Sequence, residues 1–89
     1  MFLGIDVSKK TLDVTLLSSA SKPRHKVFSN TTEGHQQLLA WLKTHDATPV
    51  HACLEATGSM GEAVALALYQ AGHQVSVVNP VLIRGFSQL

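Results

Sequence analysis

The sequence has few of the features that mark secreted or membrane-bound proteins. One of its 89 residues is a cysteine, so an internal disulfide is excluded. Met1 to Ile5 is apolar but lacks the basic start and the cleavage site of a signal peptide, and we therefore expect a protein of a reducing cytoplasm. No apolar run approaches the ~20 residues that a membrane span needs, so no membrane partner is expected.

Charge is also sparse. Charged residues make up 15% of the chain and the formal net charge is +1, which is too small to identify a nucleic-acid-binding protein by electrostatics alone. Hydrophobic residues reach 45%, a proportion that excludes a disordered segment or a coiled coil. A chain of this length has room for one small domain that buries roughly 60 to 65% of its unfolded surface.

Several chemical signatures are absent. His35, His45, His51 and His73 show no H-x₃-H spacing, so none of them is predicted to bind a metal ion. There is no phosphate-binding P-loop and no defensible Ser/His/Asp grouping. The sequence therefore offers no support for a zinc enzyme, a P-loop nucleotidase or a serine hydrolase.

The hydrophobic pattern predicts an α/β domain with the order β-β-β-α-β-α-β. Period-two alternation predicts the strands, and Ser, Thr or Asn followed three residues later by Glu predicts the helix starts. The predicted elements are strands at 1–7, 12–17 and 25–29, a helix from Asn30 to His45, a strand at 50–54, a helix at 59–71 and a strand at 75–78. Asn79-Pro80 predicts the start of a further helix, so we expect residues 1–89 to be the amino-terminal part of one domain, truncated before its end.

These elements predict a mixed five-stranded sheet with helices on its faces. The first three strands form an antiparallel meander, and the last two are reached through right-handed helical crossovers that make them parallel to their neighbours. The first strand is apolar on both sides, which predicts cover on both faces. If the fourth strand pairs with the first, Asp6 and Glu55 lie at the carboxyl ends of adjacent parallel strands, where open α/β sheets keep their sites.

Residues 18–24 are polar, contain Pro23 and predict a turn. Four residues give that turn a basic tip, which either contacts a nucleic-acid backbone or is an ordinary solvated loop: Lys22, Arg24, His25 and Lys26. Cys53 is expected to be buried as a small hydrophobic residue. Asp13 is expected to be solvated.

Two carboxylates at neighbouring strand ends suit a divalent cation. Mg²⁺ prefers one or two carboxylates, with waters and substrate phosphates completing its shell, and can support phosphodiester cleavage. Asp6 has an alternative role as the start of a turn, accepting hydrogen bonds from the amides of Ser8 or Lys9. Glu55 has an alternative role as an acid near the positive end of the following helix. Lys9 and Lys10 either bind a phosphate beside Asp6 or form an ordinary charged turn.

Two segments of the chain resemble a known family. G-I-D-V-S-K-K-T-L-D-V at residues 4–14 and L-E-A-T-G at residues 54–58 are similar to the amino-terminal part of the DEDD-type transposases of bacterial insertion sequences. That group includes the Piv DNA invertases. The Asn79-Pro80 pair fits the same pattern, so the resemblance spans essentially the whole chain.

The resemblance implies an RNase H-like fold related to the RuvC resolvases. It implies four acidic residues that hold Mg²⁺, with Asp6 matching the first and Glu55 the second. In the family the other two acids follow in a T-D-x-x-D segment, and a separate carboxyl-terminal domain carries a nucleophilic serine. Neither is found before Leu89, so residues 1–89 are expected to be inactive alone.

The function that the resemblance implies is DNA transposition or site-specific recombination in the bacterial cytoplasm. The expected partners are DNA, a guide RNA and further copies of the protein. One alternative is a lobe of an actin-like ATPase or sugar kinase, although its phosphate hairpin usually has glycine where this chain has Ser8. The other alternative is a non-catalytic RNase H-like module used for assembly.

Overall fold

The computed structural model describes residues 1–55 and 58–78. Its elements are β1 (Phe2–Val7), β2 (Thr11–Ser18), β3 (Ser21–Ser29), α1 (Thr32–Thr44), β4 (His51–Glu55), α2 (Glu62–Gln70) and β5 (Gln74–Val78). This is the predicted order. The expected turn at 56–57 and the expected helix start at 79–80 lie outside the described residues. No helix within the described ranges is long and apolar enough to cross a membrane.

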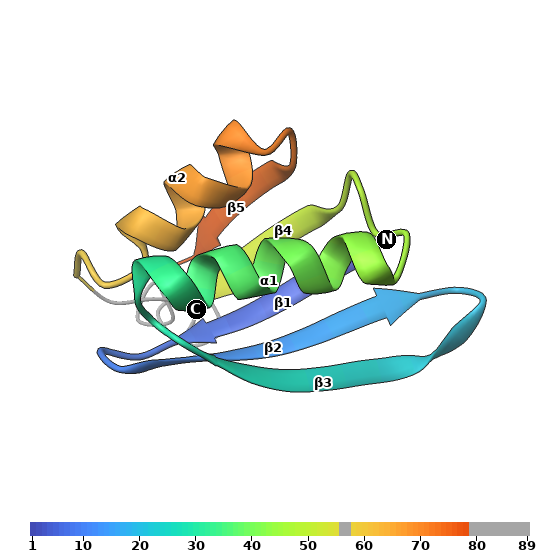
Figure 1. Cartoon of the computed structure of the whole chain (residues 1–89), viewed down its shortest axis with the longest axis horizontal. Helices are drawn as coiled ribbons and strands as arrows, with labels where there is room; N and C mark the ends of the chain where they lie inside the picture. The colour runs from blue at the N-terminus through green and yellow to red at the C-terminus, as the bar shows by residue number, and fades with distance from the viewer. Residues whose placement is uncertain (56–57, 79–89) are drawn as a thin grey trace, which may run out of the picture.

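The strands form one mixed five-stranded sheet in the order β3-β2-β1-β4-β5 (Figure 1). β2 runs antiparallel to β1 and to β3, which gives the predicted meander. β4 runs parallel to β1 and β5 runs parallel to β4, as expected for strands reached through helical crossovers. The pairing of the fourth strand with the first, on which the proximity of Asp6 and Glu55 depended, is therefore present. β1, the strand that ends in the candidate acid, is therefore the centre of the sheet.

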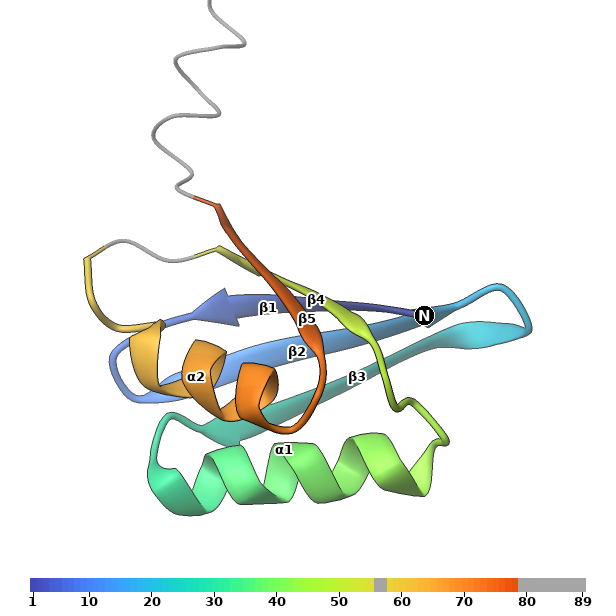
Figure 2. The same cartoon turned by 90° about the horizontal axis from the view of Figure 1, so that it is seen from above.

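Both helices cover the same face of the sheet (Figure 2). From β3 through α1 to β4, and from β4 through α2 to β5, the chain steps in one direction across the sheet. Right-handed crossovers that step in one direction place their helices on one face. The side chains that are fully buried between the sheet and the helices include Leu3, Leu12, Leu38, Leu42, Leu54, Leu68, Val14 and Val64.

The other face of the sheet, which we call the open face, is uncovered in the described part of the chain. Phe2, Leu17 and Val27 point to this face and are 61%, 44% and 53% exposed. The expectation that the first strand is covered on both faces is therefore not met by residues 1–55 and 58–78. Both crossovers placed their helices on the other side.

The start of β3 differs from the prediction. The structure confines the turn to Ser19–Ala20 and begins the strand at Ser21, so Pro23 lies inside a strand. Proline is tolerated there because β3 is an edge strand and the missing N–H removes no bond from a second neighbour. Lys22 and Arg24, which were assigned to the turn, are therefore residues of β3, whose pairing with β2 has a register shift between Ser21 and Arg24.

The helix starts also differ from the predicted capping boxes. The cap of α1 is Thr31, whose hydroxyl accepts a hydrogen bond from the amide of Gly34 at 3.1 Å. α2 begins after Gly61 with no side-chain cap, so the predicted cap at Ser59 is wrong. Both predicted helix ends are confirmed, at His45 for α1 and before Gly72, whose φ of 93° favours glycine.

Gly34 packs directly against the end of β3. A Cβ atom at this position would lie 1.8 Å from the backbone oxygen of Ser29. We predict that Gly34→Ala destabilises the fold by about 1 to 3 kcal/mol through overpacking, although alanine favours a helix by about 1 kcal/mol over glycine. Urea unfolding would measure this loss. Gln36→Ala, at an exposed position of α1, is the control and should change stability little.

His73 connects the entrances of β4 and β5. Its Nδ1 accepts a hydrogen bond from the amide of Val50 at 3.0 Å, and its side chain is 5% exposed. Burial lowers the pKa of His73 below its usual 6.5, and it has the same effect on the pKa of His35. Both imidazoles are therefore held neutral in the folded protein.

These two histidines predict a loss of stability in acid. Below a pH of about 6.5 the unfolded chain binds protons that the folded chain excludes, so acid favours unfolding. The free energy of unfolding should be level above that pH and fall below it, by at most about 1.4 kcal/mol per pH unit for each histidine. His73→Asn keeps an acceptor for Val50 without titrating, and should reduce this slope in urea unfolding at several pH values. An unchanged slope would contradict the assignment to His73.

Candidate functional site

Three carboxylates lie in one row across the centre of the sheet. Asp6 at the end of β1 is in register with Glu55 at the end of β4 and with Asp13 on β2. Neighbouring strands are about 4.8 Å apart, and side chains in register point to the same face. The adjacent Ile5 and Leu54 are buried under the helices, so this acidic row (Glu55, Asp6 and Asp13) points to the open face.

The acidic row borders a shallow hollow. Its lining residues are Gly4, Ile5, Asp6, Asp13, Thr15, Cys53 and Glu55. Gly4 leaves its floor open, because the nearest atom to a Cβ built there is the backbone oxygen of Thr15 at 4.0 Å. Cys53 is exposed beside this hollow, so the prediction that it is buried is wrong. The alternation of β4 turns Cys53 to the open face together with Glu55.

Asp13 was missed by the sequence-based prediction of the site. Asp13 is exposed as expected, but it also lies directly opposite Asp6. The Nε2 of His25 on β3 forms a hydrogen bond with its Oδ1, so Asp13 has a potential counter-charge. The signal was present in the sequence, because the short connection between the first two strands sets Val7 opposite Leu12 and therefore Asp6 opposite Asp13.

Asp6 and Glu55 are the members of the row without such a partner. Among the described residues, Asp13 and His25 form the one ion pair in which a side-chain nitrogen and a carboxylate oxygen lie within 4.0 Å of each other. The amide of Ser8 donates to the carbonyl of Thr11 at 3.0 Å, and none of the side-chain hydrogen bonds of the described residues joins Asp6 to the amide of Lys9, so the alternative role of Asp6 in the turn is not supported. Glu55 is a residue of β4, and α2 begins only at Glu62, so Glu55 is not in the first turn of that helix.

Asn30 braces the loops on both sides of the Asp6–Glu55 pair. Its side-chain amide donates to the carbonyl of Ser8 at 2.9 Å, after β1, and to the carbonyl of Met60 at 3.0 Å, before α2. The Nε2 of His35 lies 2.8 Å from its Oδ1. Because the Asn30 amide nitrogen faces two carbonyls, its Oδ1 must accept from the neutral His35 ring. The residue predicted to cap α1 thus joins α1 to both loops.

The metal-binding capacity of the hollow is limited to its carboxylates. Within residues 1–55 and 58–78, no group of three or more His, Cys, Asp or Glu side chains is arranged to hold a metal ion. Two exposed carboxylates that have no cation partner among the described residues, on adjacent strands and in register, are nevertheless a hard-oxygen donor set that fits Mg²⁺. Lys9 and Lys10 are exposed in the turn that follows β1, so two cationic side chains come shortly after Asp6 in the sequence.

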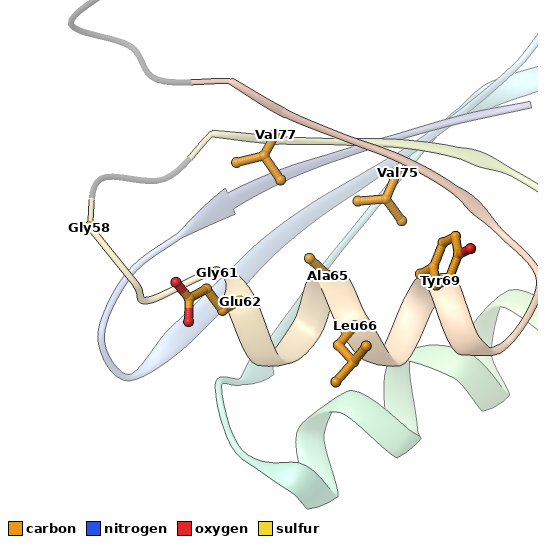
Figure 3. A pocket seen from close by; sticks show the side chains of 8 residues that line it. All are labelled: Gly58, Gly61, Glu62, Ala65, Leu66, Tyr69, Val75 and Val77. Atoms are coloured by element: carbon orange, nitrogen blue, oxygen red, sulfur yellow. The ribbon is translucent and has the colours of Figure 1, made fainter.

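A second hollow lies between α2 and β5, away from the acidic row (Figure 3). Its lining residues are Gly58, Gly61, Glu62, Ala65, Leu66, Tyr69, Val75 and Val77. Leu66, Tyr69 and Val77 are 55%, 70% and 62% exposed. This groove is mostly apolar, and Glu62 is its one carboxylate. It offers a packing surface rather than a reactive site.

Comparison with known proteins identifies the family. A family model described as "Transposase", for the DEDD transposases of the IS110 group, matches residues 3–89. The chain belongs to this family. The pilin gene-inverting proteins of Moraxella bovis and Moraxella lacunata are each similar to this chain, with 29% identity over an alignment of 89 residues. Each match covers 98% of this DEDD transposase chain and 27% of the relative, so the chain spans about a quarter of their length.

The fold of this DEDD transposase chain is similar to that of the solved Thermus thermophilus RuvC structure. The TM-score is 0.57 at 20% sequence identity, and the match covers 89% of this chain and 63% of the RuvC chain. At this identity the likeness concerns the fold. It agrees with the predicted RNase H-like sheet.

The acidic row should cost folding stability. Like charges directly opposite one another on neighbouring strands repel, so we predict that Asp6→Asn stabilises the chain by a few tenths of a kcal/mol. The gain should shrink as salt is added, because both carboxylates are exposed and screened. Thermal unfolding at low and high salt would measure it. In a double-mutant cycle, Asp6→Asn should stabilise the chain less when Asp13 is already replaced by Asn, and an unchanged effect would show that the two carboxylates do not interact.

Proposed function

We propose that residues 1–89 are the amino-terminal part of the RNase H-like catalytic domain of a longer DNA transposase or site-specific recombinase, which cleaves and rejoins DNA strands with Mg²⁺. The observation that carries this proposal is the register of Asp6 with Glu55 at the carboxyl ends of adjacent parallel strands. Membership of the transposase family and the RuvC-like fold support it. DNA as the substrate is consistent with action in the bacterial cytoplasm.

In this proposal Asp6 and Glu55 hold the metal ion. Bound Mg²⁺ would stabilise charge on a phosphodiester and lower the pKa of a bound water. The chain's own residues prepare the surface. Gly4 leaves space beside the two carboxylates, and the brace of Asn30 fixes the loops that follow β1 and precede α2. The open face allows a polymer as wide as DNA to approach them.

Further partners belong to the longer protein. Lys9 and Lys10 are proposed as weak contacts to nucleic acid beside the acidic row, because both are exposed in the turn after Asp6. A guide RNA and further copies of the protein are the other proposed partners. The exposed apolar residues Leu66, Tyr69 and Val77 are compatible with self-association, since burying them would remove apolar surface from water.

We predict that Asp6→Asn or Glu55→Gln in the longer protein lowers the rate of strand cleavage at least about 100-fold, because loss of one ligand removes several kcal/mol of charge stabilisation. DNA binding should be retained. A gel assay of DNA cleavage would measure the rate, with binding measured separately. Chelation of divalent ions should abolish cleavage by the unmutated protein, and added Mg²⁺ should restore it.

The controls for this experiment are Glu62→Gln and Asp46→Asn, which neutralise exposed acids outside the acidic row. Both should leave cleavage unchanged. Normal recombination by the Asp6→Asn and Glu55→Gln variants would instead identify the domain as a non-catalytic assembly module.

A further inference from the structure

β3 places three exposed cationic side chains along one edge of the sheet. Arg24 and Lys26 lie on either side of His25 in the strand, so these two cations share one face. Lys22 precedes them at the register shift between Ser21 and Arg24, where the alternation of faces is interrupted. Arg24 is in register with Leu16 and Lys26 with Val14, and both partners are buried on the helix-covered side. We call Lys22, Arg24 and Lys26 the cationic ladder.

The alternation of β3 sorts its basic residues by face. His25 points to the open face, where it binds Asp13 of the acidic row. Arg24 and Lys26 point to the opposite side, so their charge is not cancelled by that row. In the part of the chain that the structure describes, no carboxylate lies within 4.0 Å of a ladder cation. Three of the seven Lys and Arg residues of a nearly neutral chain are thus gathered at one edge.

The ladder is exposed but rests on a packed base. Lys22 to Lys26 are all exposed, whereas Phe28 at the end of the same face is 4% exposed. The Nζ of Lys26 lies 5.5 Å from the centre of the Phe28 ring, which in turn contacts Trp41 of α1. This cation–π contact favours an ordered lysine stem and leaves its ammonium group free to bind an anion.

The ladder can contact more than one phosphate. Side chains two positions apart on a strand, such as Arg24 and Lys26, are about 6.7 Å apart. Each strand of duplex DNA carries a phosphate about every 3.4 Å along the helix axis, so these side chains can reach different phosphates of one backbone. Because β3 is an edge strand, no neighbouring strand blocks approach from the side.

We propose that the cationic ladder binds the phosphate backbone of duplex DNA without reading its sequence. This proposal rests on the proposed function, since DNA is the partner which that function requires, and it assigns DNA a surface distinct from the acidic row. The competing explanation is that lysine and arginine on an edge strand block pairing with other sheets. That role needs charge at the edge but no affinity for DNA.

The test is a titration of the isotope-labelled 89-residue chain with a short DNA duplex, followed by NMR at salt concentrations of about 50 to 200 mM. DNA should shift the amide signals of residues 22–26. The triple variant Lys22→Gln, Arg24→Gln, Lys26→Gln should bind more than about tenfold less tightly at 50 mM salt. Its slope of log affinity against log salt should fall by as much as about 2.7, which is about 0.9 for each lost phosphate contact.

The control variant carries the same change of net charge elsewhere. Lys43→Gln, Gln36→Glu and Gln70→Glu alter exposed positions on α1 and α2, and should lower affinity much less than the ladder variant. Equal losses in both variants would overturn the proposal, because they would reflect net charge alone. An unchanged spectrum of residues 22–26 with DNA would also overturn it.

Further outcomes separate the explanations. A ladder variant that aggregates but binds DNA with unchanged affinity would show that the cations only protect the sheet edge. Tighter binding of an RNA duplex by the same residues would overturn the assignment to DNA. In a third outcome, the ladder fails to bind DNA while Asp6→Asn in the longer protein abolishes cleavage and retains DNA binding. That result would overturn the ladder proposal and leave the proposed function standing, so the two failures are distinguishable.

Discussion

The parallel pairing of β1 with β4 is the constraint on which the rest of the structure depends. It joins the amino-terminal meander to the crossover half of the chain and brings residues 6 and 55 into register across a long stretch of sequence. Leu3, Ile5 and Leu54 hold this pairing from the helix side, where all three are buried. Because side chains alternate along each strand, burial of these residues obliges Asp6 and Glu55 to point the other way. The same packing that stabilises the sheet therefore also determines the face to which the carboxylates of the candidate site point.

The direction of the crossovers determines which face is free to act. Both helices lie on one side because both crossovers step the same way across the sheet, and this leaves the acidic row uncovered in the described residues. An open face exposes like charges side by side, which opposes folding. The brace of Asn30 acts in the opposite sense, since its amide fixes the two loops nearest the Asp6–Glu55 pair and is itself oriented by the neutral ring of His35.

The sequence predicted the element order and a mixed sheet, because these follow from hydrophobic alternation and from the handedness of crossovers. It placed Asp6 beside Glu55 only on the condition that the fourth strand pairs with the first, which the structure meets. Errors arose where tertiary context overrides a local signal. Pro23 suggested a turn, but an edge strand accepts it, and Asn30 suggested a helix cap, but its amide found partners far apart in the sequence. Asp13 was overlooked because each acid was judged alone, whereas its importance depends on which residue lies opposite.

The alternation of side chains along β3 places residues of two charged surfaces on opposite faces of the same strand. One strand supplies His25 to the open face, beside Asp13, and supplies Arg24 and Lys26 to the other side of the edge. A one-residue shift of β3 would exchange these sets, placing two cations beside the acidic row and leaving Asp13 without its histidine. Phe28 prevents this shift, because it must remain buried against Trp41. A single buried aromatic residue thus fixes which face of the edge is cationic, so the separation of carboxylates from cations is a consequence of core packing.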